Sequence, residues 1–404
     1  MNSIVFGSAN HWTSPYQVGS HAWARLFVQH EWRAAYVSDP VTPWHWLNGQ
    51  NRDRIRERFS LWRKGGHASG KEMIRAWVPF SLVAPQNYPL FRSQWALENW
   101  DLFSMPPVET QLRDRGFEAP NVLWLDSVRH AGWGKRLAPA LTVLRLADWN
   151  AGFTTTPQSI VKMEQKLLAE ADIVITSARA LEDRIRPARG NRPLCAIRNG
   201  VDFAFWSSSC PEPVEYASIP CPRAIYIGAV DEWFDMPLLI EVARALKDFS
   251  FVVIGQRQID LETGESPANI YWLGTRPRET VRSYVQHAQV GIIPFKRTKL
   301  IECVCPLKLY EYMACGLPVV ATRWEELEHM KSPAKLATHA EEWIVHFQNL
   351  FGRSQEMDPV SHTQLKAASL AYAAANDWQE RWNDWQTIYS HVTGKAAATR
   401  SSKC

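Results

Sequence analysis

The chain has 404 residues, a length that exceeds one ordinary hydrophobic core and predicts two domains. Hydrophobic residues make up 46% and charged residues 21%, as expected for a globular protein. The formal net charge of +4 is small, so it gives no basis for binding nucleic acid through bulk electrostatic attraction.

Tryptophan and cysteine are the informative residue types. The 20 Trp exceed the 11 Tyr and also the 16 Phe, each counted separately, and Trp suits sugar-stacking sites and membrane interfaces as well as ordinary cores. The seven Cys are scattered without a CxxC pair, so we expect reduced thiols and no zinc site. No apolar run reaches the roughly 18 residues of a membrane span, and the N-terminus lacks a signal-peptide pattern. We therefore expect a cytoplasmic protein that is soluble or peripheral at the inner face of the plasma membrane.

The first half alternates short apolar strands with helical stretches. A helix over 159–171 runs directly into an apolar strand, which is the order of a doubly wound parallel sheet. The strands are expected at 3–7, 34–38, 74–80, 121–127, 141–147 and 171–177.

The loop after the first strand, within 7–27, is polar and punctuated by Gly, as in loops that face an acceptor or a phosphate. We expect His11 and Trp12 to lie on the acceptor side, and His21 to lie on a helix. Asp39, Asp126 and Asp148 each lie at the end of a predicted strand.

Residues 51–77 form the most cationic segment of the chain. Phe59 and Trp62 interleave with its basic residues, which are Arg52, Arg54, Arg56, Arg58, Arg63, Lys64 and Lys71. Such a segment can lie on an anionic membrane or form a solvated helix, and both interpretations stay open.

The αβ pattern restarts after a loop rich in Pro and Ser at 197–222. We therefore predict a first Rossmann-like domain over 1–198 and a second over 199–375. Strands of the second domain are expected at 223–229, 249–255, 269–274, 290–295 and 317–322. A helix over 376–393, with Trp378, Trp382 and Trp385 on one stripe, is predicted to pack back on the first domain, and 394–404 to be a disordered tail.

The stretch CPLKLYEYMACGLPVVAT, 305–322, combines several features of an anion site. Pro306 suits the first turn of a helix, whose unpaired N–H groups and dipole attract a diphosphate. Lys308 adds a positive charge, and Glu311, one turn later, can accept two ribose hydroxyls. Taken alone, the Lys and Glu also fit a surface ion pair.

These motifs resemble the donor-binding signature of GT-B glycosyltransferases, which have two Rossmann-like domains around a cleft. IRNGVDFAFW, 197–206, resembles the entry into the second domain, and IGAVDEWFD, 227–235, resembles its first turn in a subgroup that acts on bacterial polysaccharides. The resemblance covers roughly 195–325.

The resemblance implies a role for each site residue. Lys308 would hold the diphosphate of a nucleotide-sugar, expected from the resemblance to be UDP-linked, and Glu311 would hold the ribose or the sugar. The turn Gly274-Thr275-Arg276 would meet the base, and Val230, Phe295 and Leu307 would line the donor pocket. Many retaining members carry a Glu eight residues before the position of Glu311, where this chain has Cys303 beside Glu302.

The segment VLRLADWNAGF is similar to the base segment of the xanthan-pathway glucuronosyltransferase, an inverting GT-B enzyme. Asp148 would then be the catalytic base, with Trp149 on the acceptor side and no metal needed. An Asp that caps the following helix is the alternative.

The function predicted from the sequence is therefore a hexosyltransferase or glycuronosyltransferase of bacterial exopolysaccharide biosynthesis. Its partners would be a nucleotide-sugar donor and a glycan or lipid-linked acceptor. A nucleotide-sugar epimerase of the same architecture, or a catalytically silent nucleotide- or glycan-binding partner, are the alternatives.

Overall fold

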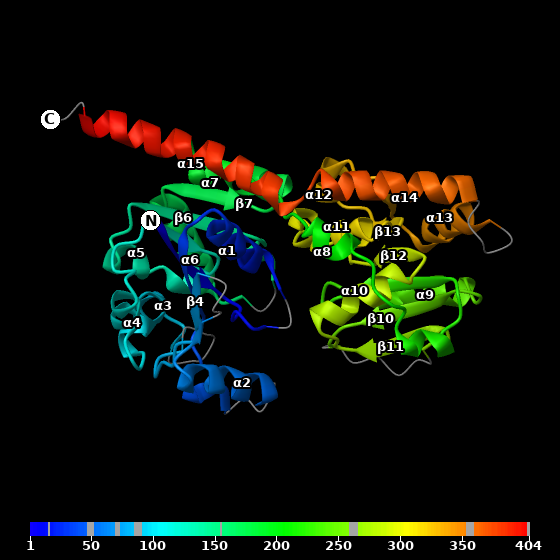
Figure 1. The fold of residues 1–404 in the computed structure, drawn as a ribbon, viewed down its shortest axis with the longest axis horizontal. Helices are drawn as coiled ribbons and strands as arrows, with labels where there is room; N and C mark the ends of the chain where they lie inside the picture. The colour runs from blue at the N-terminus through cyan, green and yellow to red at the C-terminus, as the bar shows by residue number, and fades with distance from the viewer. Residues whose placement is uncertain are drawn as a thin grey trace. The chain divides into compact units, whose positions relative to one another are not determined.

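The computed structural model describes residues 1–14, 17–46, 52–68, 73–84, 91–153, 156–257, 266–352 and 359–401. The chain divides into two compact units, Met1–Arg198 (unit 1) and Asn199–Cys404 (unit 2). Figure 1 draws each unit as a sheet with helices packed about it. Residues 51 and 69–72 of the cationic segment, and Lys71 with them, lie outside the described residues.

Unit 1 contains an eight-stranded sheet in the order β3-β4-β2-β1-β5-β6-β7-β8. All neighbours pair in parallel except β3, which runs antiparallel to β4. The strands are β1 (Ser3–Ser8), β2 (Arg33–Ser38), β3 (His67–Ala68), β4 (Ile74–Trp77), β5 (Val122–Leu125), β6 (Leu141–Leu146), β7 (Ile173–Thr176) and β8 (Leu194–Ala196).

The connections of unit 1 are helical. They are α1 (Gly19–Gln29), η1 (Pro43–Trp46), α2 (Arg52–Arg63), α3 (Gln94–Asn99), η3 (Trp100–Phe103), α4 (Val108–Asp114), η4 (Val128–His130), α5 (Trp133–Arg136), η5 (Asn150–Gly152), α6 (Gln158–Glu170) and α7 (Arg179–Arg189). The strands β5 and β7 are buried along their whole length, because helices cover both faces of a parallel sheet.

Unit 2 contains a six-stranded, wholly parallel sheet in the order β11-β10-β9-β12-β13-β14. The strands are β9 (Arg223–Ile227), β10 (Ser250–Ile254), β11 (Ile270–Gly274), β12 (Val290–Ile293), β13 (Val319–Thr322) and β14 (Lys335–Ala337).

The helices of unit 2 are α8 (Phe203–Ser207), η6 (Val214–Ser218), α9 (Met236–Ala245), α10 (Arg278–Gln286), η7 (Ile301–Cys303), α11 (Leu307–Ala314), α12 (Glu325–Met330), α13 (Ala340–Phe351), α14 (Pro359–Ala374) and α15 (Trp378–Ser401). Among the described residues, no helix combines the length and the hydropathy that a bilayer span requires.

The predicted fold class, two doubly wound α/β sheets, is confirmed. Each strand expected from an apolar run is present, whereas the short strands β3, β8 and β14 were not expected. The helix α15 extends to Ser401, into the segment predicted to be disordered from 394, and residues 402–404 are outside the described part.

In a parallel sheet, all carboxyl ends lie at one edge, and ligands bind there. The loops after β1, β2, β5 and β6 therefore share one edge of unit 1, and the loops after β9, β11 and β12 share one edge of unit 2. The candidate site residues follow these strands.

Candidate functional site

The helix α11 carries the two central residues of the candidate donor site. Pro306 is its N-cap residue, so the missing N–H of Pro falls where the helix needs no donor. The helix ends before Gly316, whose φ of +80° allows the chain to turn back toward β13. Lys308 and Glu311 thus lie in the first and second turns, where unpaired N–H groups favour an anion.

Tyr312 fixes α11 against the sheet. Its hydroxyl accepts a hydrogen bond from the backbone N–H of Ile227 at 2.8 Å, at the carboxyl end of β9. Its ring packs on Gly291 of β12 so closely that a Cβ there would lie 2.3 Å from Tyr312 Cδ2. The start of α11 is therefore held against the end of β9.

Lys308 lies over the glycine that follows β9. A Cβ at Gly228 would be 3.4 Å from Lys308 Nζ, so the ammonium group is almost in contact with the backbone. Nζ also lies 5.0 Å from the ring centroid of Tyr226 and 4.6 Å from that of Phe295. Two aromatic faces thus stabilise the cation and leave its N–H donors for a ligand.

Glu311 faces Arg278 at the start of α10. Among the described residues, no salt bridge joins Lys308 to Glu311, so the surface ion pair considered from the sequence is not what the side chains form. Both side chains are half-buried.

Burial shifts the pKa of both groups. It lowers the pKa of Lys308 to about 8, with Glu311 opposing the shift. It raises the pKa of Glu311 to about 7, while Arg278 and Lys308 act in the opposite direction. Near neutral pH both groups are thus close to titration, which is common where a ligand supplies the missing interactions.

The turn Gly274-Thr275-Arg276 joins β11 to α10. Gly274 has φ +68°, and its carbonyl accepts a hydrogen bond from Gly255 N at 3.0 Å. Gly274 and Thr275 are exposed. The Arg276 guanidinium lies 3.5 Å from both Glu215 Oε1 and the Tyr284 hydroxyl, so its neighbours orient it. Arg278 follows two residues later and connects this turn to Glu311 of α11.

Gly255 is the tightest backbone position of the site. A Cβ there would lie 1.8 Å from the carbonyl oxygen of Gly228, a distance that no side chain tolerates. The ends of β9 and β10 therefore approach each other closely because residue 255 is Gly.

The other predicted donor residues divide into two groups. Val230 is fully buried and Phe295 nearly so. The Phe295 ring also stacks on Trp324, with 5.8 Å between the ring centroids. Both residues therefore belong to the packed core next to Lys308 and have almost no exposed surface. Leu307 is half-buried at the start of α11.

Residues 199–202, with the sequence NGVD, hold the start of α11 and contact Arg278. Asn199 Nδ2 donates to the carbonyl of Cys305 at 2.8 Å, immediately before α11. Asp202 caps α8 by accepting from Phe205 N and also lies 3.6 Å from Arg278.

Cys303 and Glu302, the residues near the position of the retaining Glu, both have structural roles. Cys303 is fully buried. The Glu302 carboxylate accepts a hydrogen bond from Glu325 N at 2.6 Å, so it caps the start of α12. The Glu302 carboxylate is therefore engaged at α12 and not at α11, which carries the candidate donor residues.

Unit 1 carries three carboxylates at the ends of its strands, and they differ in their partners. Asp148 follows β6 and is exposed, and among the described residues nothing donates a hydrogen bond to its carboxylate or forms an ion pair with it. Asp126 is paired with Arg145 at 2.9 Å and accepts from Trp124 Nε1 at 3.1 Å. Of these two, only Asp148 has a carboxylate accessible to a substrate.

Asp39 is the third carboxylate and is fully engaged. It lies 3.1 Å from both Arg129 Nη1 and His130 Nε2, and Ser127 Oγ donates to it at 3.1 Å. Burial alone would raise the pKa of Asp39, but Arg129 and His130 outweigh it and lower the pKa to about 2. This cluster joins the loops after β2 and β5.

The residues predicted to lie on the acceptor side follow strands at the same edge of the sheet as Asp148. His11 is buried, with Nε2 3.4 Å from Glu57 Oε1, so its imidazole does not project into solvent. Trp12 packs on Tyr36 at 5.1 Å. Trp149 lies under the Arg184 guanidinium, 4.3 Å from its ring centroid.

His21 lies on α1, as expected, and burial lowers its pKa to about 4. Sequence reasoning missed Tyr226 and Arg278, the neighbours of Lys308 and Glu311. Among the described residues, no three His, Cys, Asp or Glu side chains converge as metal ligands.

Comparison with known proteins gives one family match and one curated relative. Residues 221–347 match the model of the family described as glycosyl transferases group 1. A Bacillus subtilis (strain 168) protein, provisionally named teichuronic acid biosynthesis glycosyltransferase TuaH, is 25% identical over 186 residues. That match covers 43% of this chain and 46% of the relative, so the chain spans about half the length of this relative.

Solved structures match over nearly the whole chain. Sucrose-phosphate synthase from Thermosynechococcus elongatus has a TM-score of 0.68 at 14% identity, covering 98% of this chain and 100% of that one. Anabaena HepE in complex with UDP-glucose has a TM-score of 0.60 at 14% identity, covering 98% and 99%. At these identities the likeness concerns the fold. The chain therefore has the GT-B fold, and its second unit carries the sequence pattern of glycosyl transferases group 1.

Proposed function

We propose that this protein is a glycosyltransferase that moves a sugar from a UDP-sugar to a hydroxyl of a glycan or lipid-linked acceptor in bacterial polysaccharide biosynthesis. The observation that carries the proposal is the position of Lys308, over Gly228 and between two aromatic rings at the start of α11. HepE, which has the same fold, binds UDP-glucose, and TuaH is named for teichuronic acid biosynthesis.

The donor groups have separate partners in this proposal. Lys308 and the N–H groups at the start of α11 bind the diphosphate, and Glu311 accepts hydroxyls of the ribose or the sugar. The exposed turn Gly274-Thr275-Arg276 contacts the base. These charges neutralise the leaving diphosphate, so the reaction proceeds without a metal.

We assign Asp148 as the base of an inverting transfer. Its carboxylate removes the proton of the acceptor hydroxyl, whose oxygen attacks the anomeric carbon as the bond to the diphosphate breaks and UDP leaves. The accessibility of Asp148, in contrast to the paired Asp39 and Asp126, supports this role. The burial of Cys303 and the capping role of Glu302 support a mechanism without the Glu of retaining relatives.

We further propose that the enzyme acts in the cytoplasm, peripherally at the inner face of the plasma membrane, with residues 51–77 in contact with anionic lipid. The helix α2 within this segment exposes Arg56 and Arg63, and Lys64 directly after it is exposed too. Such a cationic face favours an anionic surface.

Incubation with radiolabelled UDP-sugars tests the proposal. Release of UDP that depends on an added polyprenyl-linked or soluble glycan acceptor supports glycosyl transfer. Isomerised UDP-sugar without an acceptor supports an epimerase instead, and binding without turnover supports a silent partner. The anomeric configuration of the product, determined by NMR, tests inversion, and a product with the donor's configuration contradicts it.

A further inference from the structure

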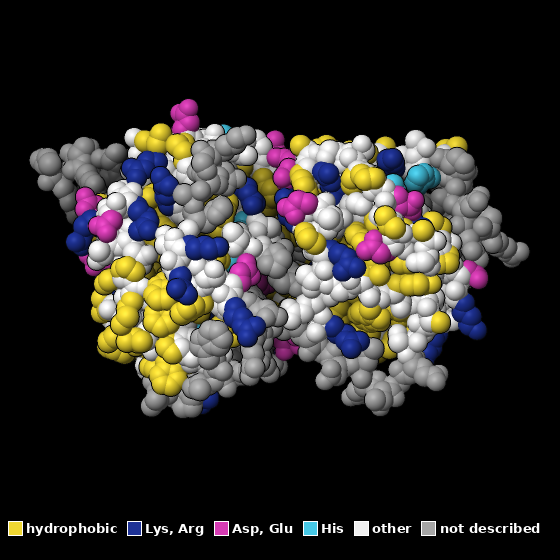
Figure 2. All heavy atoms as spheres, turned by 60° about the horizontal axis from the view of Figure 1, so that its bottom comes forward, with side chains coloured by type: hydrophobic (Ala, Val, Ile, Leu, Met, Phe, Trp, Pro, Cys, Tyr) yellow, Lys and Arg dark blue, Asp and Glu magenta, His cyan; other side chains and the backbone are white. Residues whose placement is uncertain are grey.

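Large hydrophobic side chains are exposed together on unit 1. Half of those exposed in the described part of the chain fall within 82–105, with exposed fractions of 39% to 56%. We call this set the apolar patch, and its members are Leu82, Trp95, Leu102, Phe103 and Met105. Figure 2 shows hydrophobic side chains gathered over unit 1, with Lys and Arg side chains at their margin.

The members of the apolar patch are joined by short contacts. The Trp95 and Phe103 rings lie 5.7 Å apart, and Leu82 N donates to the carbonyl of Phe103 at 3.2 Å. Residues 81 and 104 form a β-bridge between the two strands of chain. The patch therefore gathers side chains from three segments of the chain, with Phe103 in contact with the other two.

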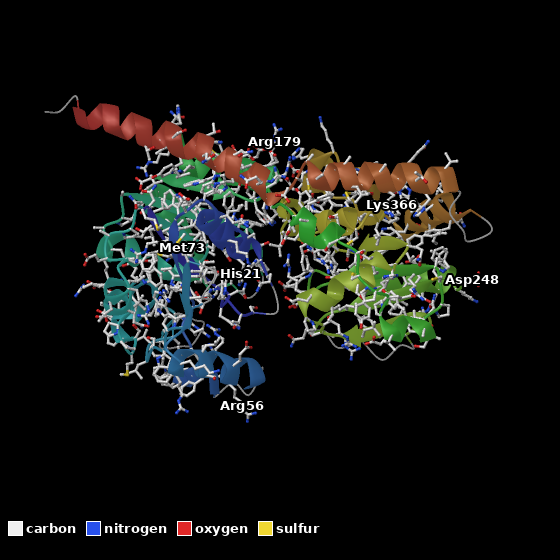
Figure 3. The ribbon with its side chains drawn as sticks, viewed as in Figure 1. His21, Arg56, Met73, Arg179, Asp248 and Lys366 are labelled. Carbon is white, nitrogen blue, oxygen red and sulfur yellow. The ribbon has the colours of Figure 1, made fainter. Side chains whose placement is uncertain are left out.

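The helix α2 lies directly beside this patch. Trp62 Nε1 donates to the carbonyl of Met105 at 2.6 Å. The inner face of α2 packs on Val41 and Val78 through Ile55, Phe59 and Trp62. Arg56 and Arg63 of α2 and Lys64 after it are exposed, and Figure 3 labels Arg56.

Exposed basic side chains accompany the apolar patch. Arg92, three residues before Trp95, is exposed. The two acidic residues within 82–105 are already paired, Glu98 with Lys166 and Asp101 with Arg136 at 3.0 Å. An apolar surface bordered by exposed cations matches the interface of an anionic bilayer, where Trp, Leu, Phe and Met enter the acyl region and Arg and Lys reach the headgroups.

We infer that the apolar patch and the exposed cations of α2 form one docking surface for an anionic lipid bilayer. This inference rests on the proposed function, because the docking surface would bring unit 1 to a lipid-linked acceptor. It extends that proposal because the apolar patch, outside residues 51–77, supplies the insertion, and the cations supply the selectivity for anionic lipid.

Co-sedimentation of the full chain with vesicles tests this inference. We expect binding to phosphatidylcholine vesicles that contain phosphatidylglycerol, and much weaker binding to phosphatidylcholine alone. Replacing the apolar members Trp95, Leu102 and Phe103 together by Ser should reduce the partition coefficient at least about tenfold. Arg63→Ser with Lys64→Ser should reduce it about fivefold per charge on anionic vesicles only.

Val345→Ser with Val360→Ser provides the matched control, because both residues are exposed on unit 2, and it should leave vesicle binding unchanged. UDP affinity and thermal melting, measured for every variant, show that the fold and the donor site are intact. Acceptor-dependent UDP release, measured separately with a soluble glycan, distinguishes failure of the proposed function from failure of docking.

Three outcomes would overturn the inference. The first is a wild-type protein that binds UDP but does not sediment with anionic vesicles. The second is a Ser variant of the patch that sediments like the wild type. The third is a wild-type dimer in sedimentation velocity that the patch variant converts to a monomer, which would make the patch an interface between two copies of the chain.

Discussion

Raising the pH from 8 to 9 is expected to weaken UDP binding, because Lys308 loses its proton in this range. Its pKa is about 8, so the protonated fraction falls from about one half to about one tenth. If only the ammonium form binds the diphosphate, the Kd rises about fivefold, or about 1 kcal/mol. The phosphates are fully ionised above pH 8, since their last pKa is about 6, and Glu311, with a pKa of about 7, is already mostly ionised.

Isothermal titration calorimetry at pH 8.0, 8.5 and 9.0 measures this effect. Above pH 8, binding should be accompanied by proton uptake, seen as a dependence of the observed enthalpy on the ionisation enthalpy of the buffer. Lys308→Arg is the matched control, because the guanidinium stays charged and should give a flat profile. Lys308→Ala should also be flat, with affinity about 10- to 100-fold weaker.

The reasoning would be refuted by an equal pH dependence in the wild type and Lys308→Arg. In that case another group would titrate. An unchanged affinity of Lys308→Ala would remove the phosphate role altogether.

Three further predictions concern catalysis, electrostatics and packing. Asp148→Asn should abolish turnover and leave the Kd for UDP within about twofold. Asp183→Asn, at an exposed carboxylate on α7, is the control and should leave turnover and the Kd unchanged. An active Asp148→Asn enzyme contradicts the base assignment. The pKa of Glu311 is raised to about 7 in the folded state, so wild-type stability falls as pH rises from 4.5 to 7. Glu311→Gln should therefore increase the free energy of unfolding by about 1–3 kcal/mol at pH 8 but not at pH 4 in urea titrations, and equal effects at both pH values would argue against a buried charge. Gly255→Ala places a Cβ 1.8 Å from a carbonyl oxygen and should destabilise by about 2 kcal/mol or more and impair UDP binding, whereas Gly134→Ala, with its nearest atom 4.0 Å away, should do neither.

The parts of the fold that sequence could predict are those with a local signal. Continuous apolar runs such as 290–295 predict buried parallel strands, and Pro306 and Gly316 mark the ends of α11. By contrast, β3 has two residues and β14 three, too few for a period to be visible. Their existence depends on the neighbouring strand that each one pairs with.

The parts of the site that sequence could not predict depend on contacts between distant segments. Arg278, 33 residues before Glu311, acts electrostatically on it, because the turn after β11 brings the start of α10 toward α11. Asp39 pairs with Arg129, 90 residues later, since β2 and β5 flank β1 in the sheet. Motif reasoning could locate the Asp residues at strand ends, but only the pairing of Asp39 and Asp126 distinguishes them from Asp148.

The helix α11 contains two sets of side chains with separate roles. Tyr312 and Leu309 are fully buried and hold the helix on the sheet, while Pro306 and Gly316 define its ends. None of these functions involves Lys308 or Glu311, and both of them lie where burial disfavours their charged forms.

Folding alone gives no reason for this pair. Charges that the fold disfavours are explained by a ligand that compensates them, and a diphosphate beside Lys308 together with hydroxyls beside Glu311 would supply that compensation. The strand-end charges of unit 1 differ from Lys308 and Glu311 in their pairing. Of the carboxylates at the strand ends there, those of Asp39 and Asp126 are paired with Arg side chains and that of Asp148 is accessible, so the polar group available for chemistry at that edge is a base rather than a cation.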